Sequence, residues 1–240
     1  MTRLWATALL AVAFGFTVPA ASRADDAPSP PTAVQPHTVT VAVEPQAWQK
    51  RRMEFAATVG AAAKGDKAAL QALATMRTAY DADPFARTPM ENMDFVGMFY
   101  APTQDLGKIM PMIVANAALG WYDALRFGSA SGRAEIFNNE AFFKKALMMG
   151  GPETVQKALK LIQDEPAESA KLVEEGLKLA ELHKDDPRYD HRWPTAYGLE
   201  RMSCAMGNPC TSIPEMLKEQ WADAWNQAIQ RVHEYYAAKK

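Results

Sequence analysis

Two histidines near residue 190 are the first side chains in this sequence whose types and spacing suggest chemistry. His183 and His191 enclose a segment with three aspartates, and Glu200 follows nine residues later. Imidazole and carboxylate groups are the usual protein ligands of zinc and other divalent metals. Their order matches no metal-binding motif such as two histidines four residues apart on one helix. We therefore expect a polar loop between helices and no metal site, with a metal-dependent enzyme as an alternative.

Serines between two glycines are the next candidates for catalysis. Residues 128–132 read Gly-Ser-Ala-Ser-Gly, which places alanine where the G-x-S-x-G motif has its nucleophilic serine. That motif also follows a strand, whereas a helix is expected here. No phosphate-binding loop and no dinucleotide fingerprint occurs anywhere in the sequence. We therefore expect no catalytic residue and no cofactor, and we expect Ser129 or Ser131 to cap the next helix.

The two cysteines, Cys204 and Cys210, enclose a five-residue stretch of turn-forming composition that includes Gly207, Asn208 and Pro209. A pair so close in sequence indicates a disulfide if the chain reaches an oxidising compartment. A metal pair is the alternative, but a zinc site of this kind needs a second pair of ligands. We predict a Cys204–Cys210 disulfide.

Aromatic and basic residues are concentrated just before these cysteines, around a proline. Tyrosine, tryptophan and arginine are the residues that most often carry the binding energy of protein interfaces. A loop between a helix and a disulfide would be preorganised, which lowers the entropic cost of binding. The alternative is that Trp193 and Tyr197 cover the core. We predict a partner-binding loop with rigid, partly exposed side chains: Tyr189, Asp190, His191, Arg192, Trp193 and Tyr197.

Signals for helices fill the sequence from residue 46 onwards, and signals for strands are scarce. Apolar residues recur three and four positions apart, and prolines and capping boxes mark helix starts. Thr88–Glu91 and Ser212–Glu215 read as such boxes, and Pro111 opens a very apolar segment. The expected helices beyond these are at 46–63, 66–80, 133–149, 152–163, 166–182 and 194–206. The prediction is an all-α fold, an irregular helical bundle or helix-hairpin array of about eight or nine helices.

The start of the chain has the layout of a secretory signal peptide. Residues 1–24 carry Arg3, an uncharged apolar stretch and then small residues at a plausible cleavage site. Residues 25–45 contain five prolines and read as a linker, in which Thr38–Val43 alternates like a short strand or extended arm. The predicted organisation is a signal peptide, a Pro-rich extended arm at residues 25–45, and a single helical domain at residues 46–240.

The net charge of the chain limits the kinds of molecule that it is expected to bind. Without residues 1–24 the chain has 24 basic and 28 acidic residues, because only Arg3 and Arg23 are removed. This acidic balance argues against a nucleic-acid partner, which requires a basic face. We expect a periplasmic protein that does not insert in a membrane after signal cleavage.

Two segments of the sequence are similar to a known class of proteins. Trp121–Phe127 through Asn138-Asn139-Glu140, and Arg192–Arg201 with Cys204, resemble periplasmic immunity proteins encoded beside bacterial type VI secretion effectors. The resemblance implies a small, helical, non-enzymatic protein that binds one secreted toxin.

The sequence thus favours an exported protein that acts by stoichiometric protein–protein contact. The alternatives are a metal-dependent enzyme or small-molecule binder that uses residues 183–200, and an accessory or chaperone-like protein of the cell envelope.

Overall fold

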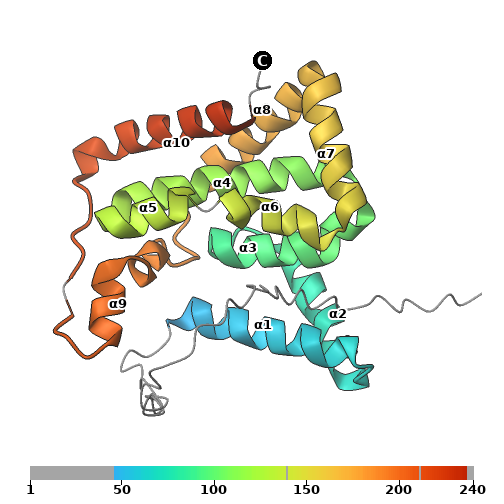
Figure 1. Cartoon of the computed structure of the whole chain (residues 1–240), viewed down its shortest axis with the longest axis horizontal. Helices are drawn as coiled ribbons and strands as arrows, with labels where there is room; N and C mark the ends of the chain where they lie inside the picture. Colours follow the sequence, from blue (N-terminus) through green and yellow to red (C-terminus); the bar gives the residue numbers. More distant parts are fainter. Residues whose placement is uncertain (1–45, 139, 211, 237–240) are drawn as a thin grey trace, which may run out of the picture. The chain divides into compact units, whose positions relative to one another are not determined.

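Ten α-helices, three 3₁₀ helices and one π-helix, with no strand, make up the regular structure of residues 46–138, 140–210 and 212–236, which are the residues that the computed structural model describes. The all-α prediction is confirmed (Figure 1). The helices are α1 (Ala47–Ala63), α2 (Lys67–Ala82), α3 (Pro89–Phe95), α4 (Leu106–Phe127), α5 (Ala130–Asn138), α6 (Glu140–Met149), α7 (Pro152–Asp164), α8 (Pro166–His183), α9 (Leu199–Ala205) and α10 (Trp221–Tyr236).

Helix α4 lies at the centre of the described residues, with α3, α8 and α10 packed against it (Figure 1). Seventeen of its 22 residues are buried, because its sequence is apolar on nearly every side. The prediction that this helix starts at Pro111 is wrong, because the helix starts at Leu106. The proline ring frees only the carbonyl of Gly107 from its helical hydrogen bond, and Gly107 is exposed, so water can satisfy that group.

The predicted caps at the starts of α2 and α3 are confirmed, and each involves residues no more than three positions apart. Thr88 Oγ1 accepts from the Glu91 amide at 3.3 Å, and Glu91 Oε2 accepts from the Thr88 amide at 3.0 Å. Asp66 caps α2 by accepting from the amides of Ala68 and Ala69. Each contact satisfies amide groups that the first helical turn leaves without partners.

Three further helix predictions differ from the structure. Residues 133–149 contain parts of two helices, α5 and α6, so the count is ten and not eight or nine. Residues 194–206 contain the 3₁₀ helix η3 (Trp193–Ala196) and the short α9. The Ser212–Glu215 box starts no helix, and α10 begins only at Trp221. The Met216 amide instead donates to the carbonyl of Arg126, at 2.8 Å, and this contact with α4 holds the segment outside a helix.

All of the described residues belong to the same compact unit. The predicted signal peptide and the predicted arm at residues 25–45 lie outside the described residues. Within the described ranges, none of the helices combines the length and apolar character needed to cross a bilayer.

Candidate functional site

A buried carboxylate on α4 is the centre of a polar network next to the predicted loop. The Asp123 side chain is fully buried. Its Oδ2 accepts from Tyr189 Oη at 3.0 Å and from Trp193 Nε1 at 2.9 Å. Its Oδ1 lies 3.0 Å from Nδ1 of His191. A buried charge is tolerated when it is paired and hydrogen-bonded, and Asp123 meets both conditions.

Both ring nitrogens of His191 face hydrogen-bond acceptors. Nδ1 faces the Asp123 carboxylate, and Nε2 lies 2.7 Å from the backbone oxygen of Asp186. Two acceptors favour the protonated ring, since only the imidazolium can donate from both nitrogens. Burial alone would lower the pKa of His191, but the hydrogen bonds to Asp123 and Asp186 outweigh it and raise that pKa.

The same burial raises the pKa of Asp123, and the hydrogen bonds from His191 and Trp193 oppose that shift. A second cation supports the carboxylate: Arg126 on α4 is buried, and its charge also favours ionised Asp123. The Arg126 guanidinium lies 3.6 Å from the ring centroid of Trp221 and 4.7 Å from that of Tyr122. These cation–π contacts hold a positive charge in the core near Asp123.

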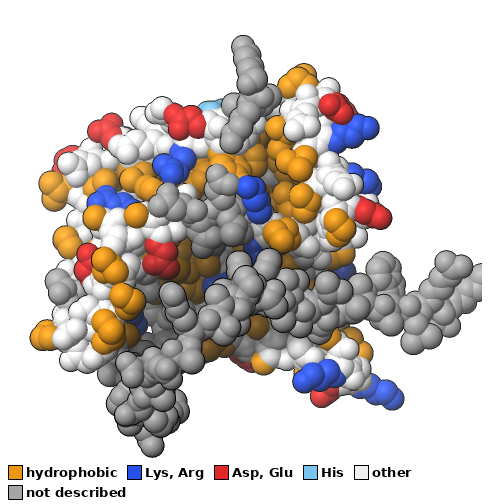
Figure 2. Space-filling view, viewed as in Figure 1, with side chains coloured by type: hydrophobic (Ala, Val, Ile, Leu, Met, Phe, Trp, Pro, Cys, Tyr) orange, Lys and Arg blue, Asp and Glu red, His pale blue; other side chains and the backbone are white. Residues whose placement is uncertain are grey.

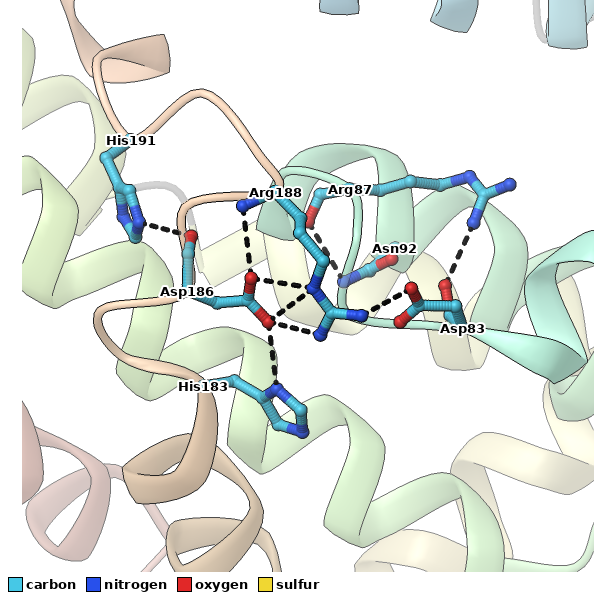
Figure 3. A network of polar contacts seen from close by, with 7 residues as sticks. All are labelled: Asp83, Arg87, Asn92, His183, Asp186, Arg188 and His191. Atoms are coloured by element: carbon cyan, nitrogen blue, oxygen red, sulfur yellow. Dashed lines mark hydrogen bonds and ion pairs between the residues drawn. The ribbon is translucent and has the colours of Figure 1, made fainter.

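A second set of contacts ties the loop to the connection between α2 and α3 (Figure 3). Arg188 donates to both carboxylate oxygens of Asp186 and, at 2.5 Å, to Asp83. The hydrogen bonds from Arg188 lower the pKa of Asp186. His183 lies 3.3 Å from Asp186 and stacks on Phe85 with ring centroids 4.1 Å apart. The loop that follows α8 is therefore fixed at both of its edges.

The structure separates the six predicted binding residues into three groups. The expectation that Tyr189 and Trp193 are partly exposed is wrong, because their exposed fractions are 6 % and 0 %. Both donate to Asp123, so they fasten the loop to the core, as does the mostly buried His191. Asp190 and Arg192 are exposed.

Tyr197, the last of the six, lines a groove of about 1080 Å³. Its half-buried ring stacks on Trp48 at 6.3 Å, and burial raises the pKa of Tyr197 to about 12. The walls of the groove come from α1, α3, α5, α6, α9 and residues 196–198 of the loop. We call it the α1–α9 groove.

Exposed apolar side chains mark the α1–α9 groove. Met53 on α1, Met149 on α6, and Leu199 and Met202 on α9 all line it, and each is exposed. Figure 2 shows hydrophobic side chains gathered on the surface of α9, at the lower left. Methionine is common at surfaces that bind other proteins, because its flexible thioether adapts to different partners.

Charged residues stand among these apolar ones. Arg52 donates to both carboxylate oxygens of Asp94, at 2.5 and 3.1 Å, and Lys145 lies 4.0 Å from the same carboxylate. Glu135 accepts from the Gly198 amide at 3.0 Å. The acidic groups that line the groove are thus already engaged by the protein.

Helix α9 is fixed in place as one wall of the groove. Glu200 Oε2 accepts from Ser129 at 2.7 Å and from Ser131 at 2.5 Å, and these bonds lower the pKa of Glu200. Ser129 also accepts from the Gly132 amide, which confirms it as the cap of α5. At the other end, Cys204 and Cys210 form the predicted disulfide, with Cα atoms 4.7 Å apart.

Gly198, just before α9, has a left-handed backbone conformation with φ of +96°. A Cβ atom there would lie 2.6 Å from the Gly132 amide nitrogen, so the loop approaches α5 more closely than another residue allows.

No group of three or more histidine, cysteine, aspartate or glutamate side chains in the described ranges is arranged to hold a metal ion. His183 and His191 are instead engaged by Asp186, Asp123 and Phe85.

Sequence reasoning missed Asp123 and the α1–α9 groove. One signal for Asp123 was available: it is the only charged residue in the apolar run from Met110 to Leu125, and such a residue must find a partner. The groove had no local signal, since its walls are far apart in the sequence.

Comparison of the chain with protein-family models, curated proteins and solved structures finds no match.

Proposed function

We propose that this chain is a binding protein that acts by stoichiometric contact and not by catalysis, with the α1–α9 groove as its docking surface. The observation that carries the proposal is the set of exposed apolar side chains at the groove, including Met53, Met202 and Leu199. Monomeric soluble proteins rarely leave large contiguous apolar patches exposed, and such patches mark interaction sites.

The fixed loop supports the same proposal. Hydrogen bonds to Asp123 and the Arg188 contacts hold the loop, so Tyr197 is presented to a partner in one conformation. A preorganised surface loses less conformational entropy on binding. The exposed Asp190 and Arg192 lie on this loop and can extend the interface beyond the groove.

Within this class, we propose a periplasmic immunity protein that neutralises a secreted antibacterial toxin. The support is the predicted signal peptide, the absence of catalytic motifs in the sequence and the resemblance described above. Binding would block the active site of the toxin or the path of its substrate. In the described ranges, no group of three or more histidine, cysteine, aspartate or glutamate side chains supports the alternative, a metal-dependent enzyme.

A protection assay tests the proposal. Cells that lack the gene are grown in dense co-culture with the parent strain, and their survival is measured. We expect the mutant to be killed and the intact gene to restore survival. Met202→Glu should restore survival poorly, because it places a charge on the groove wall. The control is Leu182→Glu, since Leu182 on α8 is 77 % exposed and does not line the groove. Unchanged survival of the deletion strain would exclude the immunity function.

A further inference from the structure

We propose that the α1–α9 groove receives an amphipathic helix of about three turns from the partner, with its apolar face inward and acidic residues along its edges. This inference rests on the proposed function and specifies the partner at the same site.

The walls present apolar side chains at helical spacing. On α1 the lining residues include Phe55 and Val59, which lie four positions apart, and Ala56, which lies three positions before Val59. On the other wall, Leu199, Met202 and Ala205 follow at steps of three. Rows of this spacing form the ridges into which the side chains of another helix fit.

The backbone of the walls excludes the most common alternative, an added strand. The walls are helices, and the described residues contain no sheet edge that could donate hydrogen bonds to an extended peptide. A partner segment that enters an apolar groove must satisfy its backbone groups internally. A helix does this, and an extended segment does not.

The dimensions agree with a short helix. The α1 wall runs from Trp48 to Val59, which corresponds to about 16 Å at the rise of a helix. A helix of that length is about three turns, and as a cylinder about 10 Å wide it occupies roughly 1300 Å³. The groove volume of about 1080 Å³ is of the same order.

The charges at the groove favour acidic flanks. Its lining residues are three basic, Arg52, Lys145 and Arg201, and two acidic, Asp94 and Glu135, so the lining has one positive charge in excess, although the whole chain has a net charge of −2. Arg52 is already paired with Asp94. The Lys145 side chain is 64 % exposed on the α6 wall, so a glutamate at the edge of a bound helix can approach it. Complementary charges of this kind determine orientation and partner choice.

Three synthetic peptides test the inference on the mature chain, residues 25–240. The first is an amphipathic peptide of about 18 residues with leucine and methionine on one face and glutamate on its edges. The second has lysine in place of each glutamate, and the third has the composition of the first in scrambled order. Binding is measured by the fluorescence anisotropy of labelled peptide. We expect the first peptide to bind at least about tenfold more tightly than either of the others, and the difference from the second to shrink as added salt shortens the screening length from about 10 Å to 3 Å.

Variants of the protein test whether the first peptide binds in the α1–α9 groove. Met53→Glu and Met202→Glu should each weaken the first peptide at least about tenfold, because both positions lie on exposed groove walls and would repel its glutamates. Leu182→Glu is the matched control and should leave the affinity unchanged. Equal binding of the scrambled peptide, no binding of the first peptide, or an equal effect of the Leu182 variant would overturn the inference.

Two other occupants would also overturn it. A dimer of the mature chain in light scattering that Met202→Glu dissociates would assign the groove to a second copy. Displacement of the first peptide by a synthetic peptide of residues 25–45 would assign the groove to this chain's own segment. If none of the peptides binds but the protection assay still depends on Met202, the proposed function stands and only the acidic helix is wrong.

Discussion

Because Asp123 and His191 form a buried pair, we predict that the free energy of unfolding changes with pH in opposite directions in the wild type and in an Asp123→Asn variant. In the wild type the folded protein holds the pKa of His191 above its unfolded value. The stabilisation from this pair is therefore complete below about pH 6.5 and is lost as pH rises through the pKa of the folded state.

In Asp123→Asn the sign reverses. The amide has no charge, so a protonated His191 would be buried without a counterion, and its pKa in the folded state should fall below the unfolded value. Stability should then decrease as pH falls below about 6.5. Removing one partner of a buried ion pair typically costs about 3–5 kcal/mol, which is the loss we expect near pH 5.5. At about pH 8, neutral His191 can accept a hydrogen bond from the new amide, so the loss should be roughly half as large.

Urea denaturation followed by tryptophan fluorescence at the two pH values measures both free energies. Asp190→Asn is the matched control: Asp190 lies in the same loop, is exposed, and its side chain accepts from the Arg192 amide at 2.9 Å. It should cost less than about 1 kcal/mol and leave the pH response unchanged. His191→Gln in the Asp123→Asn background should remove the pH response, because neither group of the pair then titrates. A loss below about 1 kcal/mol in Asp123→Asn near pH 5.5, or a pH response of the same sign as the wild type, would refute the reasoning.

Other variants give further tests. Thiol titration of denatured protein should find no free thiol, and replacing Cys204 and Cys210 by serine should cost about 2 kcal/mol in urea denaturation, since the closed loop is short; two free thiols would contradict the disulfide. Gly198→Ala should destabilise more than Gly65→Ala, because both have positive φ but only Gly198 has a backbone atom 2.6 Å from the added Cβ; equal losses would show that the clash is relieved. Trp193→Ala should cost about 3–5 kcal/mol, as expected for a fully buried aromatic residue; a loss below about 1 kcal/mol would contradict its core position.

The elements that sequence reasoning predicted well are those with local signals. The Thr88–Glu91 box, the Asp66 cap and the α7–α8 hairpin depend on residues a few positions apart. The Ser212–Glu215 box has the same local signal but starts no helix, because the Met216 amide bonds to Arg126, which lies 90 residues earlier in the chain. Local propensity is a weak preference that a tertiary contact of this kind overrides.

The predicted binding loop shows the same limit. Its composition correctly identified a preorganised segment, but the side chains that looked like exposed anchors are the ones that fix it. Tyr189 and Trp193 lie 66 and 70 residues from the carboxylate that they bind, so the sequence near them cannot show that they are buried. The groove is equally invisible to local patterns, since α1, α6 and α9 meet only in the folded chain.

The buried network and the groove are connected through the loop. Asp123 is a costly residue for the core, because a well-packed apolar side chain at a buried ionic position is often equally or more stabilising. An apolar residue could not, however, select one arrangement of Tyr189, His191 and Trp193, since apolar contacts lack the direction of hydrogen bonds. Fixing Trp193 also fixes Trp48 and Tyr197, whose rings lie 6.2 and 5.8 Å from it and line the groove. The Asp123 carboxylate, near the C-terminal end of α4, therefore sets the position of the groove wall that a partner would contact.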